Sequence, residues 1–206
     1  FGHCPVILGE DGQKLSKRRG AVSVTAYEEG GYLPEAMLNY LARLGWSHGD
    51  EELFSLDQMV AWFDGSHLSK SPAQWDPAKL TWVNAHYIKQ ADDARLAALV
   101  AAQLARRGLQ APPADRLAAM CALFKDRCST TVELADWLQM YVTDVVAPAD
   151  ELAAQLTDAV RPALVALRDR LADPARTAWD KAGIALALKE TLAAHKLKMP
   201  QLAIPL

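Results

Sequence analysis

The segment "YLPEAMLNYLARLGW", residues 32–46, sets the character of the first half of this chain. Pro34 lies where a helix begins, because the N–H that proline lacks is not needed at the first helical position. Apolar and aromatic residues follow at helical spacing, and we expect them to face inward: Met37, Tyr40, Leu41 and Leu44. Gly45 is predicted to end this helix in the left-handed conformation. The segment therefore predicts an amphipathic helix in an α-rich fold.

Two further helices are predicted downstream. Residues 55–63 begin with a capping box formed by Ser55 and Gln58. Their expected inner face consists of Met59, Val60 and Phe63. Asp76 and Pro77 are the cap and first residue of the next helix, which ends near residue 88. Its expected inward residues are Leu80, Val83 and Tyr87, and we also expect Trp75 and Trp82, beside its start, to pack in the core.

Ala and Leu dominate beyond "KQADDA", residues 89–94, which is a composition shift and a predicted domain boundary. These residues favour helices. Three helices are predicted next. The first has Leu96, Leu99, Val100 and Leu104 on its inward face and ends at Gly108, and the second has Leu117, Met120, Cys121 and Phe124. The third begins with a Thr130–Glu133 capping box and has Leu134, Leu138 and Tyr141 on its inward face. A helix from about residue 149 should break at Arg161–Pro162. A last long helix is expected from Asp180 to Ala194, which gives a helical bundle or a small superhelix.

The overall composition predicts a cytoplasmic protein without a membrane span. The chain has 206 residues and a net charge of −3, and no apolar run approaches the ~20 residues that a bilayer requires. Cys121 and Cys128 lie seven positions apart in a helical pattern, which is too far for a disulfide, so we expect free thiols. The first residue is Phe1, in "FGHCPVILG", and the last segment is "PQLAIPL". We expect a piece of a longer protein.

A basic cluster lies in "QKLSKRRGAV", residues 13–22, after a predicted strand, "HCPVIL", and a predicted turn, "GEDG". Lys14 and Lys17 lie three positions apart on this loop, so their ammonium groups can converge on one polyphosphate. Such groups stabilise the charge that develops on a departing pyrophosphate. The spacing by itself favours a solvated basic turn or a patch for a nucleic-acid backbone over a polyphosphate site.

A longer stretch carries a family resemblance. "KLSKR", residues 14–18, matches the "KMSKS" motif of class I aminoacyl-tRNA synthetases in its glutamyl form. "GYLPEAMLNYLARLGWS" and "FDGSHLSKSPAQWDPAKLTWVNAHYI" match the segment that follows it. "KDRCSTTVELADW" and "LKMPQLAIPL" extend the match more loosely. Over essentially its whole length, the chain resembles bacterial glutamyl-tRNA synthetase.

The resemblance implies three parts. Residues 1–20 would be the end of a catalytic domain with the signature loop. Residues 21–90 would be a helical domain that contacts the stem of tRNA. Residues 91–206 would be the first part of a helical-bundle anticodon-binding domain. The expected fold is therefore mainly α, with a short N-terminal strand.

The resemblance also assigns roles within the loop. Lys17 matches the motif lysine that binds the ATP phosphates, and Lys14 matches the one that assists, so both are candidate catalytic residues. Ser16 occupies the motif serine and is a third candidate ATP contact. Arg18 replaces the generic serine, a departure that is usual in this family, and Arg18 and Arg19 are candidate tRNA contacts.

Two further candidate tRNA contacts are Lys125 and Arg127, in "FKDRCSTT", where the family's helical domain approaches the anticodon. Arginine can stack on or hydrogen-bond unpaired bases. A surface salt bridge is the competing interpretation. The net charge of −3 is compatible with RNA binding, which needs local basic patches only.

The resemblance implies an ATP-dependent ligase that attaches glutamate to tRNA(Glu) through glutamyl-adenylate. ATP would enter as a substrate with Mg²⁺, and we expect no metal site in this piece. The glutamate pocket would lie in a catalytic domain outside it, so the isolated piece should be an inactive monomer. The alternatives are a non-catalytic tRNA-binding module and a shortened paralogue that glutamylates a tRNA base. The helical second half argues against that paralogue and against the glutaminyl enzyme, whose anticodon domain is a β-barrel.

Overall fold

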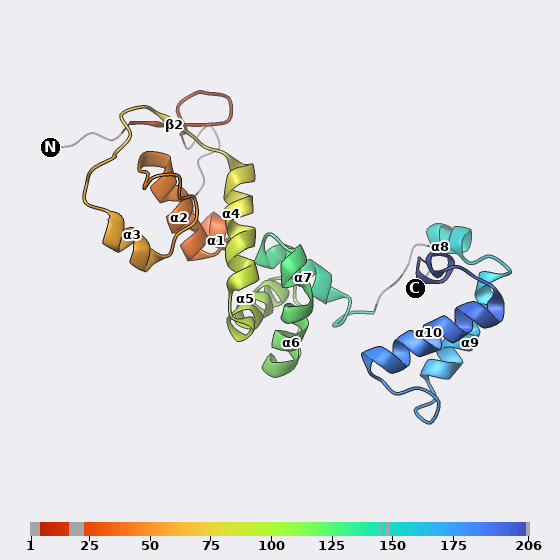
Figure 1. The fold of residues 1–206 in the computed structure, drawn as a ribbon. Helices are drawn as coiled ribbons and strands as arrows, with labels where there is room; N and C mark the ends of the chain where they lie inside the picture. The colour runs from red at the N-terminus through yellow and green to blue at the C-terminus, as the bar shows by residue number, and fades with distance from the viewer. Residues whose placement is uncertain (1–4, 17–22, 145, 147–148, 205–206) are drawn as a thin grey trace. The chain divides into compact units, whose positions relative to one another are not determined.

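The computed structural model describes residues 5–16, 23–144, 146 and 149–204. The fold is mainly helical, as predicted (Figure 1). The chain forms two compact units, Phe1–Asp144 and Val145–Leu206. Within the described residues, no helix has both the length and the apolar character needed to cross a membrane.

The first unit begins with a very small parallel sheet. Strand β1 (Ile7–Leu8) pairs with β2 (Ala73–Gln74), with Ile7 opposite Ala73 and Leu8 opposite Gln74. The strand predicted over "HCPVIL" is therefore present but short. Pro5 has no N–H for a ladder and precedes the paired residues, and residues 3 and 4 lie outside the described part of the chain.

Helices make up most of the first unit. They are α1 (Val24–Glu29), α2 (Pro34–Gly45), α3 (Leu56–Trp62), α4 (Pro77–Gln90), α5 (Asp93–Arg106), α6 (Ala114–Phe124) and α7 (Thr131–Gln139), with a 3₁₀ turn, η1 (Lys125–Arg127), between the last two. The side chain of Asp76 accepts the N–H of Lys79 at 2.9 Å, which confirms the predicted cap. The Ser55–Gln58 capping box is also confirmed. Local polar residues therefore fix where these helices begin.

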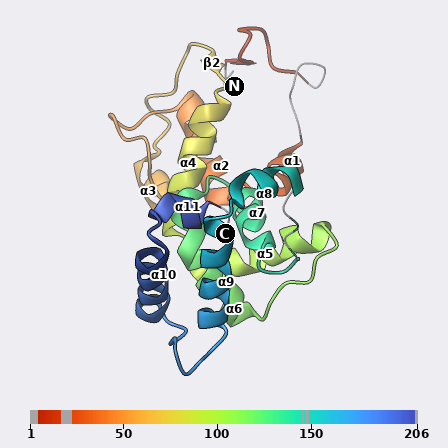
Figure 2. The same ribbon diagram turned by 90° about the vertical axis from the view of Figure 1, so that its right-hand side faces the viewer.

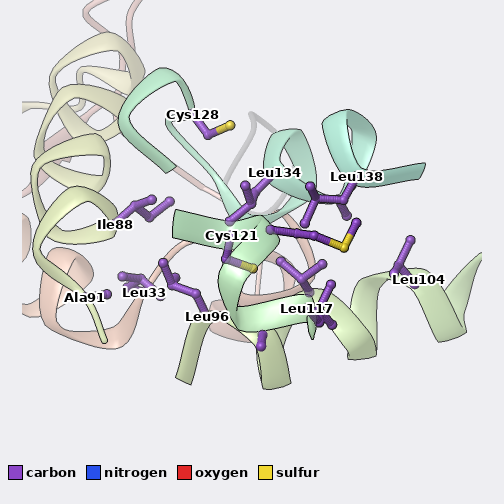
Figure 3. Close-up of a cluster of buried hydrophobic side chains, with 14 of the residues drawn as sticks. Leu33, Ile88, Ala91, Leu96, Leu104, Leu117, Cys121, Cys128, Leu134 and Leu138 are labelled. Atoms are coloured by element: carbon purple, nitrogen blue, oxygen red, sulfur yellow. The ribbon is translucent and has the colours of Figure 1, made fainter. Parts of the chain in front are cut away.

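The core of the first unit lies where helices α4, α5, α6 and α7 meet (Figure 3). Its buried members are Leu33, Ala36, Val83, Ile88, Ala91, Leu96, Ala97, Val100, Leu104, Leu117, Met120, Cys121, Cys128, Leu134, Ala135 and Leu138. The predicted faces of α5, α6 and α7 supply half of this set. Tyr141 is an exception, because it lies beyond the end of α7 and is 50% exposed.

The predicted faces of the earlier helices are partly wrong. In α2 the buried residues are Ala36, Asn39 and Tyr40, whereas Leu41 is exposed. In α3, Val60 is 71% exposed. The remaining misplaced residues are Phe63 and Trp82, both about half exposed. Periodicity identified the helices, but the face that each one buries depends on which segments pack against it.

The end of α2 also differs from the prediction. Gly45 is the last helical residue, and the described glycines with positive φ do not include it. Trp46 leaves the helix in an extended conformation, with φ of −146°. Its buried indole meets the ring of Phe54 edge-on at 5.8 Å. Packing of Trp46 therefore ends this helix, whereas Gly108 has the expected positive φ of 72°.

A buried junction joins three remote segments of the first unit. The side-chain oxygen of Asn84 accepts the N–H of Leu33 at 2.8 Å. Its amide donates to the carbonyl oxygens of Gly31, at 3.3 Å, and Ser129, at 2.5 Å. Gly31 has φ of 83°, and a Cβ there would lie 2.8 Å from the backbone nitrogen of Thr131. Any other residue would be strained at this φ, and its Cβ would clash with Thr131, so only glycine fits here.

The second unit consists of α8 (Ala149–Gln155), α9 (Val160–Leu171), α10 (Lys181–His195) and α11 (Met199–Ala203). Helices α9 and α10 lie side by side (Figure 2). The predicted break between α8 and α9 is present but lies before Arg161–Pro162, because α8 ends at Gln155 and α9 begins at Val160. Proline in a first turn removes no intrahelical hydrogen bond. The buried core is small: Ala163, Leu167, Ala187 and Leu202.

Candidate phosphate-binding and nucleic-acid interface

The predicted phosphate-binding segment begins as a hairpin. The N–H of Gly9 donates to the carbonyl oxygen of Gln13 at 2.8 Å, and the N–H of Leu15 donates to that of Ile7 at 2.8 Å. Leu8 and Lys14 form an isolated antiparallel bridge. Lys14 is therefore held on the return arm of the hairpin, and it is exposed. The sequence predicted the turn but not this return pairing.

The described part of this segment ends at Ser16, which is half-buried. Lys17, Arg18 and Arg19 lie outside the described residues. Of the predicted ATP contacts, the structure therefore places Lys14 and Ser16. Lys14 presents a positive charge at the surface, as a phosphate ligand requires.

Lys125 is held by contacts within the chain. Its ammonium donates to the carbonyl oxygen of Ala91 at 2.9 Å and lies 2.7 Å from Oδ1 of Asp93. These partners lie at the junction between α4 and α5, and the Lys125 side chain is only 19% exposed. Lys125 thus fastens the 3₁₀ turn η1 to that junction. Its role as an RNA contact stays a prediction.

Arg127, two residues further along η1, is exposed. It borders a shallow hollow of about 560 Å³ that is also lined by Ser129, Glu133, Asp136, Trp137 and Met140. Both carboxylates of the hollow are already partnered. Glu133 accepts the N–H of Ser129 at 2.6 Å, and Asp136 lies 2.7 Å from the guanidinium of Arg107. Among the described residues, no ion pair involves Arg127.

Aromatic side chains lie beside this hollow. The indole of Trp137 stacks on the ring of Phe124, with centroids 5.6 Å apart and planes 21° apart. Tyr141 lies 6.0 Å from the same Phe124 ring. Trp137 is 41% exposed, so part of its face is open to solvent. Trp137 was not among the predicted site residues, although its position outside the inward face of Leu134 and Leu138 is visible in the sequence.

The two described cysteines do not form a reactive site. Cys121 and Cys128 are free thiols and buried, as predicted. Burial raises the pKa of each thiol to about 11, and in Cys121 the neighbouring Asp93 carboxylate adds to this. Thiols with such a pKa stay protonated near neutral pH and are poor nucleophiles and metal ligands. Within the described residues, no cluster of His, Cys, Asp and Glu could hold a metal ion.

Family models match both halves of the chain. Residues 95–206 match the model described as "Anticodon binding domain". The chain belongs to this anticodon-binding family. Residues 1–82 match "tRNA synthetases class I (E and Q), catalytic domain". Members of the class I synthetase family use ATP and bind tRNA.

Curated relatives of this chain are named glutamate–tRNA ligases. It is 59% identical over 205 residues to that of Leptothrix cholodnii and 57% identical over 207 residues to that of Paracidovorax citrulli. Each match covers 100% of this chain and 43% of the relative. The chain corresponds to the C-terminal part of these ligases, and it spans less than half of their length.

Solved structures agree on the fold. A crystal structure of a glutamate tRNA ligase from Elizabethkingia meningosepticum, in complex with its amino acid, matches 98% of this chain and 43% of that one. Its TM-score is 0.79 and its sequence identity is 22%. The glutamate–tRNA ligase from Elizabethkingia anophelis gives a TM-score of 0.76, also at 22% identity. The chain therefore shares its fold with these proteins.

Proposed function

We propose that this chain forms the signature loop and the tRNA-binding part of a glutamate–tRNA ligase. The reaction would join glutamate to tRNA(Glu) through glutamyl-adenylate, with consumption of ATP. The observation that carries this proposal is the identity of 59% to such a ligase across the whole chain, from the Lys14 hairpin to the last helix. The functional division into residues 1–20, 21–90 and 91–206 belongs to the same proposal.

Lys14 and Lys17 would act on the ATP phosphates, with Ser16 as a further contact. ATP would arrive as a complex with Mg²⁺ from solution. Adenylate formation breaks the bond between the α- and β-phosphates, and negative charge grows on the departing pyrophosphate. Ammonium groups held near the departing pyrophosphate stabilise the transition state more than the ground state. The hairpin supports this role for Lys14, because its return pairing holds the backbone while the side chain stays in solvent.

Arg127 would contact unpaired bases or phosphates of the tRNA, with Arg18 and Arg19 as further contacts near the loop. Arg127 is exposed, and the neighbouring carboxylates are partnered elsewhere. Trp137 offers part of an aromatic face beside it, and base–aromatic stacking is sequence-tolerant and favourable. Lys125 would act mainly by holding η1 in place.

The isolated chain would bind tRNA weakly and would not aminoacylate it. It spans 43% of the curated ligases, so their glutamate-binding elements are expected in the remainder of the ligase. We expect a monomer that works in the cytoplasm.

Removal of the Lys17 ammonium tests the loop. In the complete ligase, Lys17→Ala should lower ATP–pyrophosphate exchange, measured with tRNA present, by about 100-fold or more. The matched control is Lys189→Ala, which removes an exposed lysine on α10. A rate within twofold of the wild type for Lys17→Ala would contradict the assignment of the loop.

Binding by the chain alone tests the second part. Its affinity for tRNA(Glu) should fall steeply between about 50 and 200 mM salt, because phosphate contacts release counterions. Arg127→Ala should weaken binding about fivefold, whereas Arg116→Ala, an exposed arginine on α6, should not. Aminoacylation by the chain alone would overturn the proposal that it lacks the catalytic elements. A different result is that the complete ligase forms the adenylate normally but the isolated chain does not bind tRNA. RNA recognition would then belong to the rest of the ligase.

A further inference from the structure

The hairpin that carries Lys14 is fastened to the chain just before α4. The backbone N–H of Trp75 donates to the carbonyl oxygen of Leu8 at 2.7 Å, which extends the pairing of β1 with β2. The side-chain amide of Gln74 donates to the carbonyl oxygen of Glu10 at 3.0 Å. Two consecutive residues thus hold the arm that leads into the loop.

Trp75 also contacts the element that follows the loop. Helix α1 begins at Val24, and its Tyr27 ring lies 5.6 Å from the Trp75 indole, with planes 50° apart. Helix α1 has no buried residue, so it has little hydrophobic anchorage of its own. Burial raises the pKa of the Tyr27 hydroxyl, and nearby Tyr32, whose ring lies 5.8 Å away, adds to this. Tyr27 is therefore the side chain that attaches α1 to the strand region.

The indole of Trp75 is itself held from behind. The buried ring of Tyr40, on α2, meets it edge-on at 4.9 Å. The hydroxyl of Tyr40 accepts the N–H of Asp76 at 2.6 Å, and Asp76 caps α4. Tyr40 therefore fixes the position of Trp75, and Trp75 contacts both chain segments that flank the loop.

We propose that Trp75 is a positioning residue for adenylate formation. Its backbone hydrogen bond to Leu8 and its aromatic contact with Tyr27 fix the distance between β1 and α1. These two elements form the frame from which the loop reaches ATP. The proposal rests on the proposed function. Rates of positioned reactions fall steeply when a group is displaced, by up to about 100-fold for 1 Å. Loss of this frame should therefore lower catalysis more than it lowers binding of tRNA.

Four variants of the complete ligase test this inference. Trp75→Ala removes the indole, Tyr27→Ala removes only the contact with α1, and Trp75→Phe keeps an aromatic ring. Trp82→Ala is the matched control, because this tryptophan is about half exposed and lies on α4. For each variant we would measure kcat and the KM for ATP in pyrophosphate exchange, the Kd for tRNA, and the folded fraction.

Trp75→Ala and Tyr27→Ala should each lower kcat about tenfold or more, with the Kd for tRNA within about twofold of the wild type. Trp75→Phe should recover most of kcat, and Trp82→Ala should match the wild type. Where Trp75→Ala fails to fold, Tyr27→Ala decides the matter. A kcat for Tyr27→Ala within twofold of Trp82→Ala would overturn the inference. Lys17→Ala separates the two proposals: if it lowers exchange while Tyr27→Ala does not, only the positioning role fails.

Discussion

The two compact units of this chain are built in different ways. Among the described residues, the apolar cluster of the first unit contains sixteen buried residues, whereas that of the second contains four. The first unit also buries Asn39 and Asn84, which hydrogen-bond backbone groups far away in the sequence. In the second unit, a surface ion pair between Arg170 and Glu190 joins α9 to α10. Small units bury a smaller share of their surface and are less stable.

This difference indicates that the first unit is the more stable of the two. In the second, Trp179 is 71% exposed, and its indole N–H donates to the carbonyl oxygen of Leu171 at 2.9 Å. Its side chain thus fastens a loop while adding little buried area. We expect the second unit to unfold first on heating or in urea, and hydrogen exchange read by mass spectrometry separates the two units.

The largest effect should follow the loss of the buried junction. Asn84→Ala leaves the N–H of Leu33 and the carbonyl oxygen of Ser129 without their partner and should lower the free energy of unfolding of the first unit by about 4 kcal/mol. Urea unfolding with hydrogen exchange measures this. The exposed Gln110→Ala is the control. A loss below about 1 kcal/mol would show that the junction does not hold the unit together.

A smaller loss is expected from the core of the second unit. Leu167 is fully buried there, and Leu167→Ala should cost about 3 kcal/mol, enough to remove exchange protection from α9 and α10. Leu134→Ala should cost the first unit a similar amount and leave much of its protection in place, because its core is larger. If Leu167→Ala lowered hydrogen-exchange protection equally in both units, the two units would not unfold independently.

Helix caps should contribute about equally in both units. Asp76 accepts the N–H of Lys79 at 2.9 Å, and Asp180 accepts that of Gly183 at 2.7 Å. Replacement of either by Ala should cost about 1 kcal/mol, whereas Asn should retain most of the stability. Thermal unfolding of the four variants tests this. If Asn is as harmful as Ala at either site, the stabilisation depends on charge and not on capping.

The smallest effect concerns an ion pair across the first unit. The guanidinium of Arg95 donates to the carboxylate of Glu35 at 2.5 and 2.9 Å, and this hydrogen bonding holds the pKa of Glu35 below its usual value against the opposing effect of burial. A lowered folded pKa stabilises the fold above the unfolded pKa, and this gain disappears as pH falls through the folded value. Glu35→Gln should therefore cost about 0.5 kcal/mol at pH 7.

The difference between Glu35→Gln and the wild type should begin to shrink near pH 4.3, about the pKa of glutamate in an unfolded chain, and vanish at lower pH. Unfolding in urea from pH 7 to pH 3 measures it. A difference that stays constant over this range would assign the effect to packing.

Much of the fold and part of the candidate site could be predicted because they depend on neighbours in the sequence. The starts of α3 and α4 were predicted from the caps Ser55 and Asp76, and each of these residues accepts an N–H three positions along. The last long helix was expected from Asp180, which the structure shows to be its cap. The basic loop was recognised from its motif, and Lys14 is exposed on it. The turn before the loop was predicted as well, and Gly12 has the expected positive φ of 71°.

Only the tertiary structure decided which faces are buried and which remote residues meet. Periodicity predicted Val60 and Leu41 as inward residues, yet both are exposed, because the segments that pack on a helix lie elsewhere in the chain. Asn84 joins residues 51 and 45 positions away, and Trp75 contacts both Leu8 and Tyr27. Sequence alone determined most of the helices and the N-terminal caps of α3 and α4, because hydrogen bonds within three or four residues fix them. The junction and the loop anchor depend on long-range packing, which no local pattern encodes.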